Sequence, residues 1–253
     1  MNKKFWALLL VTFIISLIVT APASILNLVL DKASNGKIAL ANTAGTIWSG
    51  AGTPVLRQKN GGLITLNSLH WNIAVLDLFS GKLNTQLKWD IDQPVAPMNV
   101  VVTANQIELQ HIYVPLPGTL LDEASDFLKP AVLRGLIILK SDSILISKQG
   151  LQGVATADWL NASSLLSSVS PLGDYHFTFS STPAGVDITL STTSGALILA
   201  GQGHFIESAG LDFNGTAQAA KGKEAALHEL LSNLGPELTP GVNTFSLFPT
   251  KPH

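Results

Sequence analysis

The strongest constraint on this chain is an apolar segment close to its N-terminus. Lys3 and Lys4 precede an apolar run over 5–21 that only isolated Thr and Ser residues interrupt. Such hydroxyl groups cost little in lipid because they bond back to helix carbonyls. The run is at the short end of the roughly 17–25 residues that cross a bilayer, and apolar residues resume after Pro22. The pattern predicts a membrane anchor over 5–30, preceded by a cytoplasmic stub of residues 1–4.

The lysines also predict the orientation of this segment. Lys3 and Lys4 lie before it, and the next lysine is Lys32, so the positive-inside rule places the N-terminus in the cytoplasm. The remaining chain is then exported. A cleaved signal peptide is the alternative, since Ala21-Pro22-Ala23 fits the small-x-small pattern and cleavage would follow Ala23. The apolar run is longer than the usual signal core of about 7–15 residues, which favours the anchor.

Composition limits the class of the exported part, 31–253. Only 13% of the residues are charged, against roughly 25% in a typical soluble chain, and Ser, Thr, Asn, Gln and Gly supply the remaining polarity. This mixture favours strands and turns. The net charge is −2, and no cluster of Lys and Arg could bind a phosphate backbone, so nucleic acid is not an expected partner. There is no cysteine, which excludes disulfides and thiolate metal sites.

Short segments of strand-like composition recur along the exported part, and they predict a large antiparallel β-rich domain. The segments are 37–41, 63–72, 82–91, 99–109, 132–147, 153–159, 175–180, 186–192, 196–205 and 210–219. The clearest pair is 175–180 and 186–192, in which apolar and polar residues alternate on either side of the turn signal 181–185. Such alternation is typical of a sheet with one solvated face.

Two or three short helices are expected among the strands. Helical spacing of apolar residues predicts helices near 120–128 and 227–234, which end at Pro130 and at Gly235-Pro236. A weaker pattern near 165–169 ends at Pro171. Trp48 and Trp159 each lie in a glycine-bounded strand, so two similar halves, near 31–130 and 131–253, are an open alternative to one domain.

No catalytic, metal-binding or cofactor-binding constellation is visible. The histidines, His70, His111, His176, His204, His228 and His253, form no ligand pair, and Asp90 and Asp92 are better explained as the solvated end of a strand. No serine lies in a GxSxG elbow. The glycine pairs Gly50/Gly52 and Gly201/Gly203 complete no phosphate-binding motif and indicate a bulge or a close backbone approach. The chain is expected to be no enzyme and to need no cofactor.

Tryptophans on strands are the remaining candidates for a functional surface. Trp48, Trp71, Trp89 and Trp159 are flanked by small or polar residues. Large core anchors are the simplest interpretation of these residues. The alternative is a surface or apolar groove that binds a partner strand or lipid.

A series of short motifs resembles a known family. Gly45-Thr46-Ile47-Trp48-Ser49-Gly50 is followed along the chain by 69–71, 79–83, 151–153, 171–175, 194–203 and 211–215. In order, spacing and chain length, and with the N-terminal anchor, the series resembles type II secretion system protein N, also called general secretion pathway protein N. The resemblance covers almost the whole chain.

The resemblance implies a single-pass protein of the bacterial inner membrane with a large periplasmic domain. Its expected partners are other components of the type II secretion system, which exports folded proteins across the outer membrane, together with the lipid of the inner membrane. No catalytic residue is carried over. An envelope lipid-handling protein with an apolar β-groove is the alternative, suggested by the strand-rich, charge-poor composition.

Overall fold

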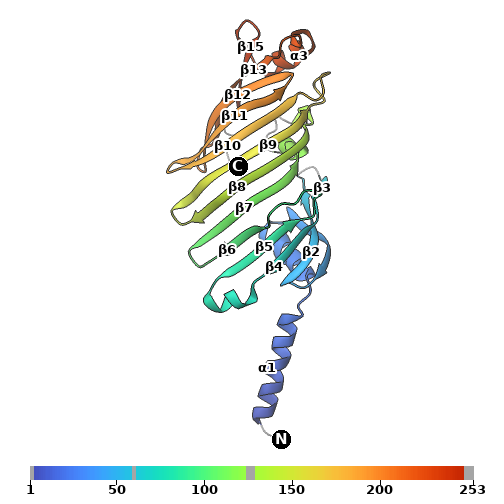
Figure 1. The fold of residues 1–253 in the computed structure, drawn as a ribbon, viewed down its shortest axis with the longest axis vertical. Coiled ribbons are helices and arrows are strands. Elements are labelled where there is room, and N and C mark those ends of the chain that lie inside the picture. Colours follow the sequence, from blue (N-terminus) through green and yellow to red (C-terminus); the bar gives the residue numbers. More distant parts are fainter. Residues whose placement is uncertain (1–2, 59–60, 124–128, 248–253) are drawn as a thin grey trace. The chain divides into compact units, whose positions relative to one another are not determined.

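The computed structural model describes residues 3–58, 61–123 and 129–247, and the fold is mainly β with few helices. The chain divides into two compact units, residues 1–104 and 105–253, and each is built on antiparallel strands (Figure 1). The predicted β-rich fold class is therefore confirmed. The division into similar halves near residue 130 stays a prediction.

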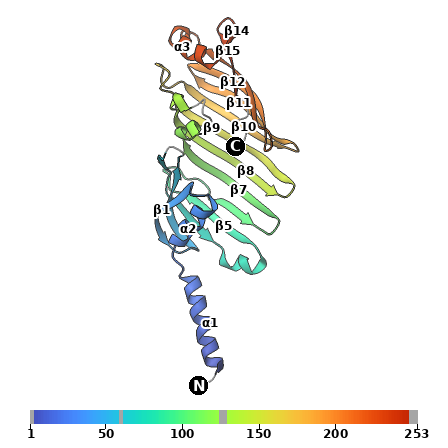
Figure 2. The same ribbon diagram turned by 180° about the vertical axis from the view of Figure 1, so that it is seen from behind.

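Unit 1 begins with two helices, α1 (Lys3–Val19) and α2 (Ser24–Ala33). Between them, the chain is no longer helical at Pro22, which forms an isolated bridge with Thr46. The apolar sequence after Pro22 therefore belongs to a second helix. α2 lies against β1 (Ile38–Gly45) (Figure 2). The Asn27 Oδ1 atom accepts a hydrogen bond of 2.8 Å from the Leu40 main-chain N–H. No helix in the described part of the chain is both long and apolar enough to cross a membrane.

The sheet of unit 1 has the strand order β1-β2-β4-β5-β6, with β3 paired to β2. The strands after β1 are β2 (Ser49–Arg57), β3 (Leu63–Thr65), β4 (Leu69–Ile73), β5 (Leu83–Trp89) and β6 (Met98–Val102). The 3₁₀-helix η1 (Val75–Ser80) joins β4 to β5. A small core of Ala23, Leu40 and Trp71 forms where α2 and its N-terminal turn meet one face of this sheet.

The sheet of unit 2 runs in the order β7-β8-β9-β10-β11-β12-β13-β15-β14. Its strands are β7 (Gln106–Pro117), β8 (Arg134–Ser147), β9 (Gly150–Ser163), β10 (Gly173–Thr182), β11 (Gly185–Gly195), β12 (Leu197–Ile206), β13 (Gly210–Ala219), β14 (Glu237–Thr239) and β15 (Val242–Leu247). The helical segments are η2 (Gly118–Glu123), η3 (Lys129–Ala131) and α3 (Glu224–Leu234).

Two buried clusters stabilise unit 2. One contains Trp159 and Tyr175, whose rings are 5.6 Å apart, together with Leu190 and Phe213. The Tyr175 hydroxyl donates to the Leu197 carbonyl at 3.1 Å, and burial, with a smaller effect of Asp174, raises the pKa of this phenol above its usual range. The second cluster packs three leucines of α3, Leu227, Leu230 and Leu231, against Leu172, Leu197 and Ala217.

Most predicted strands correspond to strands of the structure. The expected hairpin is confirmed by the register of β10 and β11, from Tyr175 opposite Thr192 to Thr182 opposite Gly185. The segment 63–72 is divided between β3 and β4, and 99–109 between β6 and β7. β2 was not predicted because Gly50, Gly52 and Pro54 lower its strand propensity.

The predicted helices have three outcomes. The helix near 227–234 is confirmed as α3. The helix near 165–169 is wrong: these residues form turns, in which the Ser164 hydroxyl accepts from the Leu166 N–H and the Ser167 hydroxyl from the Val169 N–H. Such local bonds compete with helix formation. The helix near 120–128 falls largely on 124–128, outside the described residues, although η2 covers its start.

Candidate binding surfaces

Two of the four tryptophans predicted on strands are core residues, and Trp48 lies in the turn between β1 and β2 and not on a strand. Trp71 is 6% exposed and Trp159 is 8% exposed. Their indole N–H groups donate to main-chain carbonyls, Trp71 to Thr46 at 3.1 Å and Trp159 to Arg134 at 3.0 Å. A buried indole ring whose N–H group has a hydrogen-bond acceptor is typical of a structural core residue. A binding role for these two would need the core to open.

Trp48 and Trp89 are only half-buried. The Trp48 Nε1 atom donates a 2.8 Å hydrogen bond to the Ile18 carbonyl in the last turn of α1, so this side chain joins the helix to the sheet. The buried Trp89 Nε1 atom has no hydrogen-bond partner among the described residues. The structure places Trp48, Trp71 and Trp89 in unit 1 and Trp159 in unit 2. Their use as a binding surface stays a prediction.

A hollow of about 530 Å³ lies on unit 1. β4 and β5 place His70 opposite Lys88 and Asn72 opposite Gln86, and all four side chains are exposed. Paired residues share one face of a sheet, so these side chains form one polar patch that lines the hollow. We call it the β4–β5 patch. The patch was not predicted from the sequence, although polar and apolar residues alternate in 69–73 as expected for a strand with one polar face.

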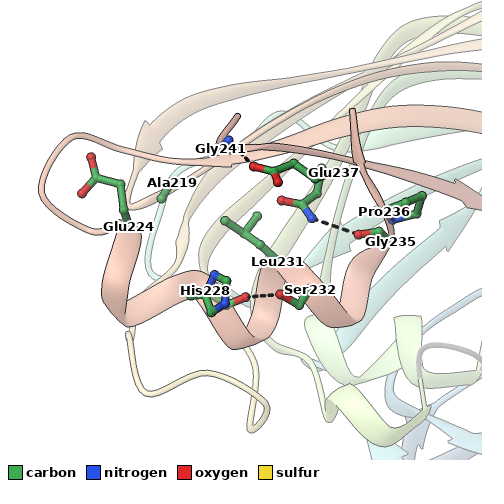
Figure 3. A pocket seen from close by; sticks show the side chains of 10 residues that line it. Ala219, Glu224, His228, Leu231, Ser232, Gly235, Pro236, Glu237 and Gly241 are labelled. Carbon is green, nitrogen blue, oxygen red and sulfur yellow. Dashed lines mark hydrogen bonds between the residues drawn. The ribbon is translucent and has the colours of Figure 1, made fainter. Parts of the chain in front are cut away.

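A second hollow, of about 330 Å³, lies between α3 and the turn from β14 to β15 in unit 2 (Figure 3). Glu224, His228 and Ser232 contribute to its wall from α3. On the other wall the Asn243 amide donates to the Gly235 carbonyl at 2.9 Å, and the Glu237 carboxylate accepts from the Gly241 N–H. The Glu237 and Asn243 side chains therefore already stabilise the chain around this hollow.

A row of paired ionisable groups lies on the polar face of the unit 2 sheet. Asp158 contacts Lys140 at 2.9 Å and His176 at 2.7 Å, and Asp187 contacts His204 at 2.6 Å. The hydrogen bond from Lys140 holds the pKa of Asp158 below its usual value, although partial burial opposes this effect and His176 adds to it. Register explains the grouping, since β9 and β10 place Asp158 opposite His176.

Three residues of this row, Thr178, His176 and Asp158, are arranged somewhat like a catalytic triad. The Thr178 hydroxyl is 3.4 Å from the His176 Nε2 atom, whose other ring nitrogen contacts Asp158. The order resembles a nucleophile–histidine–carboxylate relay. The three residues stand on adjacent paired strands, where the backbone N–H groups needed for an oxyanion hole serve the sheet ladder. The arrangement is better explained as a cross-strand polar network.

The remaining candidates are not brought together. Asp90 and Asp92 are exposed just beyond the end of β5. Within the described ranges, no group of three or more His, Cys, Asp or Glu is placed to hold a metal ion, and His253 lies outside those ranges. Lys3 begins α1, and Lys4 follows in its first turn. The orientation assigned to these two lysines stays a prediction.

Comparison with known proteins gives one informative match. No curated protein and no solved structure is similar enough to the chain to count as a match. The family model described as "Type II secretion system (T2SS), protein N" matches residues 36–246. This range runs from just before β1 to the last residues of β15, and so includes both sheets. The chain therefore belongs to the protein N family of the type II secretion system, as its motifs suggest.

Proposed function

We propose that this protein is an inner-membrane-anchored, non-enzymatic component of a bacterial type II secretion system. Its two β units lie in the periplasm and bind other components of the system, which supports export of folded proteins across the outer membrane. The observation that carries the proposal is the family match over 36–246. It covers the sheets of both units, so the resemblance concerns the whole β part of the chain.

The properties of α1 support the anchor. This helix is apolar on all sides after its two lysines, and its large side chains from Phe5 to Val19 are about half exposed. A helix that is apolar all round needs either a protein core or a lipid environment. α1 has no covering layer in unit 1, which favours lipid. Lys3 and Lys4 at its start then favour a cytoplasmic N-terminus.

The β4–β5 patch is the proposed contact with a protein partner. His70, Asn72, Gln86 and Lys88 present hydrogen-bonding groups around a hollow, and all of them are exposed. A polar surface of this kind gives a weak, specific contact. A membrane tether raises the effective concentration of a partner at the same membrane, so a weak contact suffices. No bond-making step is required.

Deletion of the gene tests the function. We expect secretion of folded exoproteins to fall while their export into the periplasm continues. The reason is that the proposed system acts only at the later step, passage from the periplasm across the outer membrane. Protein re-supplied from a plasmid should restore secretion. Unchanged secretion in the deletion strain would contradict a required role in the system.

Photo-crosslinking tests the contact surface. A photoreactive amino acid at Asn72 or Gln86 should give adducts with another secretion component in cells. Thr65 is the matched control, since it is exposed in the same unit but lies on β3, away from the β4–β5 patch. Equal adducts from Thr65 and Gln86 would exclude the patch as the specific contact.

An envelope lipid-handling function is the second candidate, and one feature of unit 2 favours it. Phe177 and Phe179 stack at 6.3 Å on the apolar face of β10, and on that face of β12 Phe205 is 42% exposed. The register of β10, β11 and β12 brings these rings to the same side of the sheet. Native mass spectrometry of the purified protein discriminates: co-purifying lipid supports this candidate, and a lipid-free protein that captures secretion components supports the first.

A further inference from the structure

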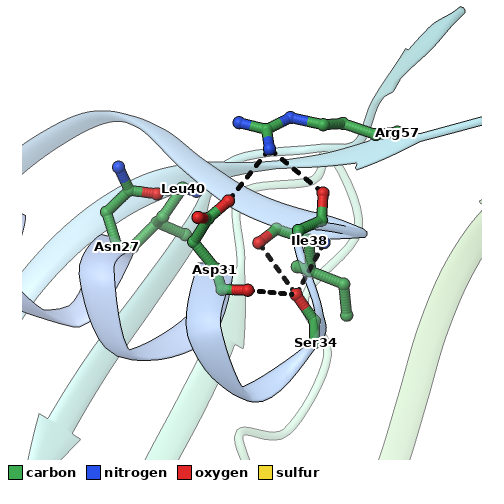
Figure 4. A network of polar contacts seen from close by, with 7 residues as sticks. Asn27, Asp31, Ser34, Ile38, Leu40 and Arg57 are labelled. Atoms are coloured by element: carbon green, nitrogen blue, oxygen red, sulfur yellow. Dashed lines mark hydrogen bonds and ion pairs between the residues drawn. The ribbon is translucent and has the colours of Figure 1, made fainter. Parts of the chain in front are cut away.

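α2 exposes more large apolar side chains than expected for a surface helix, although Leu26 packs into the core of unit 1. Two of its polar residues contact the sheet: the Asn27 Oδ1 atom accepts from the Leu40 N–H, and the Asp31 carboxylate pairs with Arg57 at 2.9 Å (Figure 4). Large apolar side chains point outward instead, with Leu28 63% exposed and Val29 55% exposed. In a water-facing helix the apolar side chains would lie on the core side.

The 3₁₀-helix η1 shows the same combination of an acidic contact with the sheet and exposed apolar side chains. The Asp77 carboxylate accepts a hydrogen bond of 3.1 Å from the Asn84 amide, so the charged residue of η1 faces its own sheet. Leu76 is 79% exposed and Phe79 is 88% exposed. Two separate elements of unit 1 thus pair an acidic side chain with their own sheet and expose large apolar side chains. Scattered single apolar residues need no explanation, but groups of them on two elements do.

Both elements start at the end of unit 1 where α1 arrives. The Trp48 side chain bonds to Ile18 of α1, and the Trp48 carbonyl accepts a 2.7 Å bond from the Ile73 N–H, two residues before η1. The same turn holds the start of α2, since the Ala23 N–H donates to the Gly45 carbonyl at 3.1 Å. Figure 1 shows α1 leaving unit 1 at the end where the teal η1 segment lies.

We propose that Ile25, Leu28, Val29, Leu76 and Phe79, which we call the α2–η1 face, dock unit 1 on the surface of the lipid bilayer that α1 enters. The inference rests on the proposed membrane anchor and adds a second, peripheral contact with lipid. Continuity identifies lipid as the occupant, because the face begins at the exposed apolar surface of α1 without an intervening charged residue in 20–24.

The length of α1 also favours lipid. Its 17 residues extend over about 25 Å at 1.5 Å per residue. The hydrocarbon core of a bilayer is about 30 Å thick, so an upright α1 leaves a few ångströms of the core to be filled by the residues that follow. The α2–η1 face begins directly after them, at Ile25. Trp48 at the junction suits the membrane–water boundary, where indole rings concentrate, and the exposed Lys32 can reach lipid phosphates from the end of α2.

Spin labels on single cysteines test the proposal directly, because the natural chain contains no cysteine. The variants are Leu28→Cys and Phe79→Cys in the full chain, reconstituted in vesicles of phosphatidylethanolamine and phosphatidylglycerol. Leu63→Cys is a matched control, since Leu63 lies in the same unit and is 65% exposed, against 63% for Leu28. Ile14→Cys reports separately on the insertion of α1.

The readout is collision of each label with molecular oxygen, which concentrates in lipid, and with a water-soluble nickel complex. We expect labels at positions 14, 28 and 79 to favour oxygen and the label at 63 to favour nickel. If position 14 favours oxygen while 28 and 79 behave like 63, the docking proposal is wrong and the anchor stands. If position 14 also favours nickel, the anchor and the docking proposal both fail. Labels at 28 and 79 that neither reagent reaches would indicate a protein partner and would overturn lipid docking.

Discussion

At the scale of single residues, the indole N–H groups of unit 1 differ in whether they have a hydrogen-bond acceptor. The Trp71 N–H donates to the Thr46 carbonyl, and the Trp48 N–H donates to the Ile18 carbonyl. The Trp89 N–H is buried without a partner among the described residues. An unsatisfied buried donor costs about 1–3 kcal/mol, whereas a satisfied one contributes about 1 kcal/mol. Substitution of the two kinds of tryptophan should therefore have different consequences.

Replacement of Trp71 by Phe should destabilise unit 1 more than replacement of Trp89 by Phe. Trp71→Phe leaves a cavity in the core and deprives the Thr46 carbonyl of its donor, while Trp89→Phe removes a donor that has no acceptor. We expect the free energies of unfolding of the two variants to differ by at least about 1 kcal/mol. Urea unfolding followed by far-ultraviolet circular dichroism measures both. Equal losses would mean that Trp89 has an acceptor in solution.

Asp158 should make the stability of unit 2 depend on pH. Its pKa in the folded protein is lowered chiefly by the hydrogen bond from Lys140, against a reference value of 3.8. A lowered pKa adds stability above the unfolded value, and that stability is lost as the pH falls through the folded value. Asp158→Asn should thus cost roughly 0.5–1 kcal/mol at pH 7, and this cost should shrink as the pH falls through the lowered pKa of the folded protein.

Thermal unfolding of Asp158→Asn and of the natural protein across this range measures the effect. Lys140→Met is the matched background: it removes the main cause of the lowered pKa, so Asp158→Asn should cost less there than in the natural chain. The same cost in both backgrounds would assign the effect to another contact of Asp158.

At the scale of strands, paired glycines make room for aromatic rings. A Cβ atom on Gly50 would lie 2.6 Å from the Trp71 ring, and one on Gly203 would lie 2.6 Å from the Phe213 ring. The close approach predicted for Gly50/Gly52 and Gly201/Gly203 is therefore confirmed, and its cause is packing of a large side chain over the neighbouring strand. Gly50 lies directly opposite Trp71 on β4, and Gly203 lies directly opposite Phe213 on β13.

Gly203→Ala should destabilise unit 2 by about 1–3 kcal/mol, because the added methyl group overlaps Phe213 and the Asp212 carbonyl. Gln202→Ala is the control on the same strand: its side chain is exposed on the opposite face, and its cost should be within about 0.5 kcal/mol. Urea midpoints of the two variants give the comparison. A Gly203→Ala variant as stable as the control would mean that Phe213 moves without cost.

Local patterns predicted much of these sheets, and tertiary contacts account for the rest. Alternation identified β10 and β11, and leucine spacing identified α3. α2 could not be separated from the apolar run by composition. The roles of Asn27 and Asp31 depend on tertiary contacts with β1 and Arg57, which the local sequence does not reveal. β2 was hidden by its proline, which lies where the pairing of β2 changes from β4 to β3.

The candidate surfaces were less predictable than the strands. The alternation in 69–73 could have identified the polar side of β4, but the pairing with Gln86 and Lys88 depends on the register of β5. The bond between Trp48 and Ile18 joins residues 30 apart in sequence, and no local pattern encodes it. The interpretation of the tryptophans as core anchors fits Trp71 and Trp159, which are buried, whereas Trp48 and Trp89 are half-buried.

At the scale of the whole molecule, the proposed function depends on which side of the membrane the two units occupy. α1 itself gives no direction, since it is apolar throughout after Lys3 and Lys4. The proposed orientation thus depends on two charges next to the membrane, and exposed lysines far from α1 should not affect it. This difference in position allows a charge-matched control.

Lys3→Gln combined with Lys4→Gln should reduce the fraction of chains with the β units outside the cytoplasm. Alkaline phosphatase fused to the C-terminus reports this fraction, since its disulfides form only after export. Lys221→Gln combined with Lys223→Gln removes the same charge from an exposed turn of unit 2 and should leave reporter activity per chain unchanged. Equal activity of both double variants would show that the lysines do not set the orientation. Absence of activity in the natural chain would place the units in the cytoplasm and contradict the proposed function.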